Sequence, residues 1–320
     1  MSTIAPMVGA GISSAVQVAV VAVGGPVLLG VMRKVRCRLE GRVGAPVLQP
    51  LVDIRKLFRK ERLRPDQATW IFALAPVVLV STVAVAAAVT PLVTTHPAFG
   101  AGSDLFVLVY LLLVGSTILA LAGMDAGTAF GGMGSSRAVT IGALAEPALL
   151  VSILALSATA HSSNLAAIVR ATLAGPGSVA TPQRLFALGS LLIVIVAESG
   201  RLPVDNPATH LELTMVHEAM VLEYAGPDLA VVTVGEAMRL TLLLGIFVNL
   251  VAPWGVATTT HAADIAVGVA SLAAKVALLG VALSVFEVST AKVRLFRIPE
   301  LLAGAFVLAL LGVVSGLVVK

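Results

Sequence analysis

Long apolar stretches constrain this chain more than any other feature of its sequence. Each runs for about 20 residues without the alternation of a barrel strand, and a helix of that length crosses the hydrocarbon core of a bilayer. The stretches fall at roughly residues 9–32, 69–93, 104–124, 138–160, 184–198, 228–252, 263–290 and 299–319. The sequence therefore predicts an all-α, polytopic membrane protein, with residues 1–320 forming a single integral membrane domain of about eight transmembrane helices.

The overall composition agrees with a membrane protein and excludes several kinds of site. Of the 320 residues, 58% are hydrophobic and 12% are charged, whereas a soluble domain averages roughly 25% charged residues. Cys37 is the single cysteine, which excludes an intrachain disulfide, a cysteine-ligated iron–sulfur cluster and a tetracysteine zinc site. The basic residues cluster beside the apolar stretches, so the net positive charge is not evidence for nucleic-acid binding.

Lysine and arginine are distributed unequally between the two alternating sets of connections. The first connection is heavily basic from Arg33 to Arg64, whereas the opposite set offers little more than Arg170. Because basic residues favour the cytoplasmic side of a membrane, the sequence predicts a plasma-membrane protein with both termini outside. The same bias places the segment between stretches five and six, residues 198–226, in the cytoplasm.

Residues 198–226 are far more polar than the stretches on either side of them. Two prolines, Pro203 and Pro207, favour an extended or turning start. A helical pattern follows, in which His210, Thr214 and His217 share one face, so the segment is predicted to line a polar cavity. A plain solvated loop is the alternative. The candidate coupling residues of this structured cytoplasmic loop are Glu198, Arg201, Asp205, Glu212, Glu218 and Glu223.

Ionisable residues also interrupt the apolar stretches themselves. They are Glu146, Glu236, Arg239, Lys275 and Glu287. A charge at the centre of a bilayer costs roughly 2.5–3.5 kcal/mol on insertion scales, so such residues normally face protein or water and mark an ion path. Glu236 and Arg239 are close enough along one helix to pair on the same face. Ion pairs that only fix helix packing are the alternative interpretation.

The segment from about residue 50 to 61 is predicted to form an amphipathic cytoplasmic helix. Leu51, Ile54, Leu57 and Phe58 form an apolar stripe, which suits a helix on the membrane surface or beneath a partner protein. The candidate docking residues in and beside it are Arg42, Asp53, Arg55, Lys56, Arg59 and Lys60.

Two short motifs resemble a zinc site and a phosphate-binding loop but lack the residues that either site needs. His217-Glu218 lacks the second histidine of a His-Glu-x-x-His zinc motif. The run of glycines at 131–134 has no following Lys-Ser/Thr and lies between the expected spans, so a phosphate loop is not indicated.

Four other motifs occur together along the chain. The first connection contains Arg-Val-Gly-Ala-Pro from Arg42 and Asp-x-x-Lys-Leu-Phe-x-Lys-Glu from Asp53. The central segment contains Glu-x-x-Arg-x-Pro-x-Asp from Glu198 and Glu-Tyr-x-Gly from Glu223. Together they resemble the membrane subunit of respiratory complex I that forms the quinone-site chamber, and its counterpart in membrane-bound NiFe hydrogenases such as formate hydrogenlyase.

Departures from the complex I pattern indicate the hydrogenase branch, of the formate hydrogenlyase and hydrogenase-4 type. Complex I continues with Pro-Phe-Asp-Leu-Pro-Glu-x-Glu, whereas this chain has Val204 in place of the phenylalanine and Ala-Thr-His at 208–210 in place of the carboxylates. The spacing from Asp205 to Glu223 is also longer than in complex I. These differences argue against a working quinone pocket.

The resemblance implies a subunit of an oxidoreductase complex that holds no redox centre and no cofactor itself. The NiFe centre and iron–sulfur clusters would lie in partner subunits. Expected partners are the NiFe hydrogenase large and small subunits, iron–sulfur subunits and antiporter-like membrane subunits, together with the lipid bilayer. The chain would anchor the hydrophilic module and couple it to proton translocation.

Two alternative functions are kept open. One is the quinone-site membrane subunit of a complex I-like NADH–quinone oxidoreductase. The other is a stand-alone proton-coupled transporter, for which an internal repeat would be typical, and no convincing repeat is evident in this sequence.

Overall fold

The computed structural model describes residues 4–97, 100–175, 181–205, 215–259, 261–291, 293 and 297–318. These residues form helices and connecting segments, with no β-strand among them. The helices are α1 (Ile4–Leu39), α2 (Gln49–Leu57), α3 (Trp70–Val89), α4 (Leu105–Asp125), α5 (Ala129–Ala160), α6 (Leu165–Ala174), α7 (Pro182–Glu198), α8 (His217–Val221), α9 (Gly226–Val251), α10 (Ala262–Ser289) and α11 (Ile298–Val318).

The helix lengths confirm the all-α, polytopic class. In the described part of the chain, 7 helices are long and apolar enough to cross a membrane, namely α1, α3, α4, α5, α9, α10 and α11. The fifth expected span, at 184–198, corresponds to α7, whose 17 residues fall short of the roughly 20 that a bilayer requires. The chain is a multi-pass membrane protein.

Helix α5 begins well before residue 138, where the apolar stretch was expected to start. Thr128 caps it by accepting the N–H of Gly131 at 3.2 Å, so the glycines at 131–134 lie inside a helix and not in a loop. A Cβ at Gly131 would lie 2.3 Å from the carbonyl oxygen of Gly123, and one at Gly134 would lie 2.7 Å from Cβ of Ala219. The glycines therefore allow α4 and α8 to approach α5 closely.

Helix α6 was not expected from the sequence. Asn164 caps its start by accepting the N–H groups of Ala166 and Ala167 at 3.0 and 3.1 Å. Its 10 residues are too few to cross a bilayer, and the helix forms part of the connection between α5 and α7.

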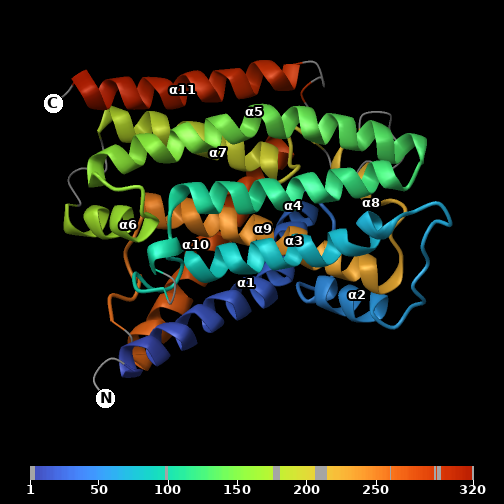
Figure 1. Ribbon diagram of the computed structural model, residues 1–320, viewed down its shortest axis with the longest axis horizontal. Helices are drawn as coiled ribbons and strands as arrows, with labels where there is room; N and C mark the ends of the chain where they lie inside the picture. Colours follow the sequence, from blue (N-terminus) through green and yellow to red (C-terminus); the bar gives the residue numbers. More distant parts are fainter. Residues whose placement is uncertain are drawn as a thin grey trace.

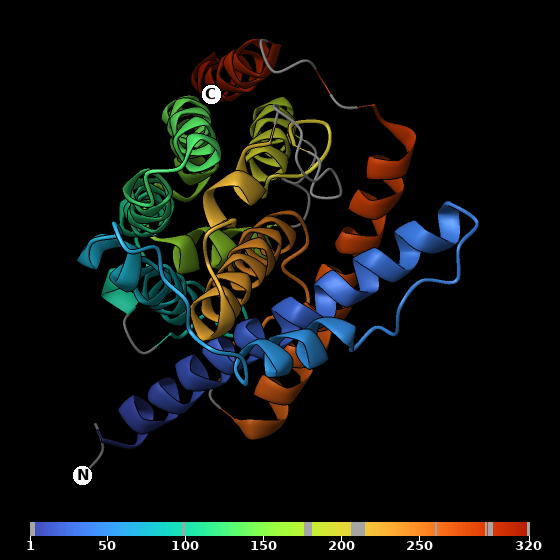
Figure 2. The ribbon, with the colours of Figure 1, turned by 90° about the vertical axis from the view of Figure 1, so that its right-hand side faces the viewer.

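The long helices run side by side and give the molecule two distinct ends (Figure 1). One end carries α2, α8 and the polar segment around residues 198–226, and we call it the α8 end. The opposite end carries α6 and both termini, and we call it the α6 end. Figure 2 views the molecule from the α8 end and shows α10 beside α1. Helix α11 lies on the side of the bundle opposite α1, next to α5 and α7.

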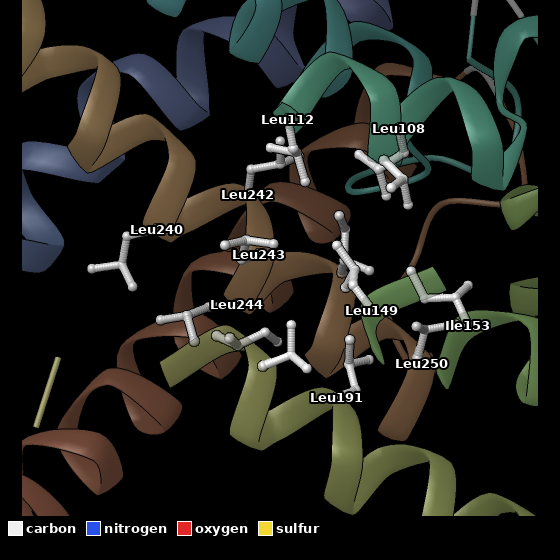
Figure 3. Packing of buried hydrophobic residues seen from close by; sticks show 14 of the residues in the cluster. Leu108, Leu112, Leu149, Ile153, Leu191, Leu240, Leu242, Leu243, Leu244 and Leu250 are labelled. Atoms are coloured by element: carbon white, nitrogen blue, oxygen red, sulfur yellow. The ribbon is translucent and has the colours of Figure 1, made fainter. Parts of the chain in front are cut away.

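Helix α9 occupies the centre of the bundle. It packs against α1, α2, α3, α6, α7 and α10, and 67% of its apolar span is buried, compared with 22% for α10 and α11. Figure 3 shows its leucines interdigitating with those of α4, α5 and α7. The labelled core residues are Leu108, Leu112, Leu149, Ile153, Leu191, Leu240, Leu242, Leu243, Leu244 and Leu250. Close packing of this kind stabilises helix association in lipid, and it fixes the position of every polar residue that α9 carries.

Candidate functional site

A cavity of about 390 Å³ lies at the α8 end of the bundle. Its walls come from α1, α3, α4, α5, α7, α8 and α9 and from the segment that follows α7. It brings together residues that are far apart in the sequence and that were predicted to act in coupling. These are Glu146, Glu198, Arg201, Asp205, Glu218, Glu236 and Arg239.

One ion pair in the cavity wall joins α7 to α9. Nη2 of Arg239 pairs with Oε2 of Glu198, and the two side chains are 10% and 8% exposed. The predicted pairing of Arg239 with Glu236 is therefore wrong. Glu198 is the last residue of α7, where the negative end of the helix dipole disfavours a carboxylate, and the long side chain of Arg239 reaches across to compensate for it.

Glu236 lies in the same wall and makes no ion pair with any residue that the structure describes. Its Oε1 is buried and has no hydrogen-bond partner among the described residues. Glu146 of α5 also makes no ion pair within the described parts of the chain. Both carboxyl groups can therefore take up or release a proton without breaking a salt bridge.

A second ion pair joins the segment after α7 to α10. Nη1 of Arg201 lies 3.3 Å from Oε1 of Glu287, and these side chains are 12% and 2% exposed. Burial lowers the pKa of the Arg201 guanidinium, and Glu287 opposes that effect. Arg201 faces the cavity, whereas Glu287 lies behind it and is absent from the cavity wall.

Asp205 ties the same segment to the start of α8. Its Oδ2 accepts the N–H groups of Val216 and His217, each at 3.2 Å, and lies 3.8 Å from Nδ1 of His217. Nη1 of Arg137, on α5, donates to the carbonyl oxygen of Met215 at 3.0 Å. Together these bonds place α8 against the cavity.

The environment of His217 shifts its ionisation. Burial lowers its pKa, but the interaction with Asp205 and the charge of Glu236 outweigh burial, so the pKa of His217 is raised above its ordinary value. The sequence predicted that His217 would face a polar cavity, and it is part of the wall.

Other predicted coupling residues lie elsewhere. Nζ of Lys275 donates to the carbonyl oxygen of Ala252 at 2.7 Å, which places it at the α6 end, where a cation stabilises the C-terminus of α9. Glu223 is partly buried outside the cavity wall. Glu212, like His210 and Thr214, lies outside the described residues.

Helix α2 presents basic residues at the surface of the α8 end. It ends at Leu57, short of the predicted residue 61, and buries Pro50 and Ile54. Asp53 accepts a bond from Nε2 of Gln49 at 2.8 Å. The exposed basic residues on and beside the helix are Arg42, Arg55, Lys56, Arg59 and Lys60.

Sequence reasoning missed an ionic contact between the first connection and α9. Asp228, in the first turn of α9, pairs with Arg62 at 3.0 Å and with Arg64 at 3.2 Å. Nearby, the hydroxyl of Tyr224 donates to the carbonyl oxygen of Phe72 at 3.0 Å, and the two rings stack with centroids 4.0 Å apart. The Glu-Tyr-x-Gly motif marks this region in the sequence, but it does not indicate that Asp228 binds Arg62 and Arg64 or that Tyr224 binds Phe72.

Arg33 and Gly200 also line the cavity and were not predicted to do so. Arg33 was counted only as part of the basic connection. Gly200 carries no functional group, so its role depends on close approach and is invisible in the sequence.

Comparison with known proteins gives consistent relatives. A family model described as NADH dehydrogenase matches residues 12–317. Hydrogenase-4 component C of Escherichia coli (strain K12) is 33% identical over 287 residues, which are 89% of this chain and 89% of that protein. Formate hydrogenlyase subunit 4 of the same organism is 31% identical over 290 residues, 91% of this chain and 93% of that protein.

A more distant relative and a solved structure extend the comparison. An NADH-quinone oxidoreductase subunit of Syntrophotalea carbinolica is 31% identical over 227 residues, 66% of this chain and 67% of that protein. A chain in the structure of the membrane-bound sulfane sulfur reductase, an archaeal respiratory membrane complex, has a similar fold, with a TM-score of 0.80 and 20% identity over 95% of this chain and 98% of that chain. The relatives are named as components or subunits, so the homologues belong to multi-subunit complexes.

Proposed function

This chain belongs to the NADH dehydrogenase family, and we propose that it is the membrane anchor and ion-coupling subunit of a formate hydrogenlyase-type NiFe hydrogenase complex. The two hydrogenase relatives support this choice because they align with 89% and 91% of the chain. The NADH-quinone oxidoreductase relative aligns with 66% of it.

The observation that carries the proposal is the composition of the cavity wall. Asp205 and Glu218 come from the segment between α7 and α9, and Glu146 and Glu236 come from membrane-spanning helices. Ionisable groups within a membrane protein normally mark an ion path. The cavity therefore offers a route from the α8 end into the membrane.

Coupling would begin at the loop. Electron transfer in a docked partner changes the local charge, and nearby carboxyl groups respond by changing protonation. The Arg201–Glu287 and Glu198–Arg239 pairs would carry that change to α10 and α9, because each joins a loop-side residue to a long helix.

The proposed orientation follows the basic residues. The α8 end faces the cytoplasm, and both termini lie outside the plasma membrane. The NiFe hydrogenase large and small subunits and the iron–sulfur subunits would dock on α2 and the loop, and they would hold the metal centres. Antiporter-like membrane subunits would contact the exposed apolar helices.

Replacement of the unpaired carboxyl groups tests this function. Glu146→Gln and Glu236→Gln keep the size and hydrogen-bonding capacity of the side chain but remove its titration. In vesicles that contain the whole complex, both variants should assemble and should lose proton movement per turnover. Glu300→Gln is the matched control, because Glu300 is exposed and lies outside the cavity wall. Wild-type proton movement in both cavity variants would leave the chain as an anchor alone.

A quinone-site subunit is the second candidate function. The cavity of about 390 Å³ falls within the roughly 300–1,000 Å³ of small-molecule sites, and Leu29, Leu113 and Leu229 form apolar parts of its wall. Quinone that copurifies with the complex, together with turnover that depends on added quinone, would favour this candidate. Turnover at full rate in quinone-depleted membranes would reject it.

A further inference from the structure

His217 lies where three parts of the α8 end meet. It is the first residue of α8, its backbone N–H binds Asp205 from the preceding segment, and it lines the cavity together with Glu236 of α9. The side chain is 26% exposed, although Nδ1 itself is buried and accepts or donates no hydrogen bond within the described residues. Nδ1 of the imidazole therefore faces the Asp205 carboxylate at 3.8 Å, an ionic contact longer than a hydrogen bond.

Gly200 fixes the position of the imidazole ring. A Cβ at this residue would lie 2.5 Å from Nδ1 and 2.9 Å from Cε1 of His217. The residue also has a φ of +58°, which favours glycine. The backbone at Gly200 thus supports the ring directly, and a side chain there would push the ring out of its site.

Charged groups surround the ring on several elements. Asp205 and Arg201 come from the segment after α7, Glu236 and Arg239 from α9, Glu146 and Arg137 from α5, and Glu218 from α8. Arg201 and Arg239 are already paired with Glu287 and Glu198. The negative charges of Asp205 and Glu236 both favour the imidazolium, and the positive charge of Arg239 opposes them.

We propose that His217 is a proton-transfer residue, which passes protons between the loop side of the cavity and Glu236 in α9. The inference rests on the proposed coupling function and names a residue that carries it. The imidazolium gives one proton to the Glu236 carboxylate: an N–H bond breaks, an O–H bond forms, and both groups become neutral. A proton taken up from the cavity then restores the imidazolium.

Asp205 acts as a positioning residue in this scheme. It holds the backbone of His217 through the bond at 3.2 Å and lies 3.8 Å from Nδ1. Against the lowering effect of burial, the interaction with Asp205 and the charge of Glu236 raise the pKa of His217 above its ordinary value of about 6.5, so they favour the imidazolium that donates the proton.

The first test measures the pKa of His217 in the purified complex by NMR of ¹⁵N-labelled histidine. The signal is assigned by its loss in His217→Gln. Glu236→Gln removes a nearby negative charge and should lower the pKa of His217, and Asp205→Asn should lower it as well. Glu300→Gln, on the exposed surface of α11, should leave it unchanged. An unchanged pKa in Glu236→Gln would overturn the inference.

The second test follows proton movement against pH in vesicles that contain the whole complex. His217→Gln should lose most of the proton movement, and the pH dependence that remains should no longer contain the histidine titration. His261→Gln is the matched control, because His261 is exposed at the α6 end and should keep the wild-type profile. If His217→Gln does not assemble, the effect of Glu236→Gln on the pKa of His217 decides the question.

The outcomes separate the inference from the function on which it rests. A wild-type pH profile in assembled His217→Gln overturns the role of His217, while the coupling function stands if Glu146→Gln and Glu236→Gln still lose proton movement. An assembled wild-type complex that moves no protons overturns both.

Discussion

Buried ion pairs join helices at the α8 end, whereas buried hydrogen bonds to neutral oxygens join segments of the α6 end. The α8 end contains the Glu198–Arg239 pair and the Arg201–Glu287 pair. At the α6 end, Oε1 of Gln17 accepts the N–H groups of Leu92 and Val93 at 3.1 and 2.8 Å.

Two more residues at the α6 end bind neutral oxygens. Nδ2 of Asn249 donates to the carbonyl oxygens of Pro91 and Leu92 at 3.0 and 2.7 Å. Even the buried guanidinium of Arg184 donates to neutral oxygens, those of Thr172 and Leu250, at 2.8 and 2.7 Å. Amide and carbonyl groups do not titrate near neutral pH.

The difference separates a responsive end from a fixed end. The α8 end surrounds a cavity of about 390 Å³, whereas the cavity beside Asn249 at the α6 end has about 10 Å³. A proton or a partner's charge can change the ion pairs of the first end, whereas the amide and carbonyl contacts of Gln17 and Asn249 at the second end do not titrate. Four predictions test this comparison, in order of their effect on the stability of the chain.

Loss of Arg239 should be the most damaging change. Arg239→Gln strands Glu198 in a buried site, and breaking a buried pair from one side costs about 3–5 kcal/mol. Chemical denaturation of the purified chain in detergent measures the loss. The double variant Glu198→Gln with Arg239→Gln should recover much of it, because no charge remains unpaired. A double variant as unstable as the sum of the two single variants would show that the pair is not coupled.

Loss of Gln17 should destabilise the α6 end by a smaller amount. Gln17→Leu removes the acceptor of the buried N–H of Val93, at a cost of about 1–3 kcal/mol. The same substitution at exposed Gln67 should have little effect. Proton movement and its pH profile should stay unchanged in Gln17→Leu. A shifted pH profile would mean that the two ends are not independent.

The pH dependence of stability should arise at the α8 end. The folded protein raises the pKa of His217, so protonation of His217 stabilises the fold. This contribution is fully present below about pH 6.5, the unfolded value, and is lost as pH rises through the raised pKa. Melting temperatures measured across that window should fall in the wild type and in Gln17→Leu. An equal fall in His217→Gln would assign the titration to another group.

Charge reversal on α2 should have the smallest effect on stability. Arg55, Lys56 and Arg59 are exposed, and such surface changes usually stay within about 0.5 kcal/mol. The triple reversal to glutamate should nevertheless release the hydrophilic module from the membrane subunit, as seen by copurification. Arg170→Glu, at the α6 end, is the control that should retain the module. A complex that survives high salt with all three residues reversed would contradict the docking role.

The sequence indicated the helices of the bundle more reliably than their contacts. Long apolar stretches predict spans because lipid requires every backbone group to bond within its own helix. The same criterion placed the start of α5 too late, since Gly131 and Gly134 lower hydropathy while they pack against neighbouring helices. It passed over α6 as well, because the 10 residues of this apolar helix are too few to register as a span.

For the polar residues too, the sequence indicated their importance more reliably than their contacts. Glu236 and Arg239 stood out because a charge is costly in an apolar stretch. Their proximity suggested a pair, yet Arg239 reaches Glu198 on another helix. Helix periodicity describes neighbours within one helix, and it contains no information about which residue a neighbouring helix presents.

The sequence by itself determined that this chain is a polytopic helical membrane protein with a charged segment between residues 198 and 226. Hydropathy, charge placement and local motifs are properties of neighbouring residues, and they can be read along the chain. Only the tertiary structure decided that Glu146, His217 and Glu236 share one cavity, and that the backbone of Gly200 supports the imidazole. These contacts join residues from different helices, so they exist only after packing has set which helix faces lie against each other.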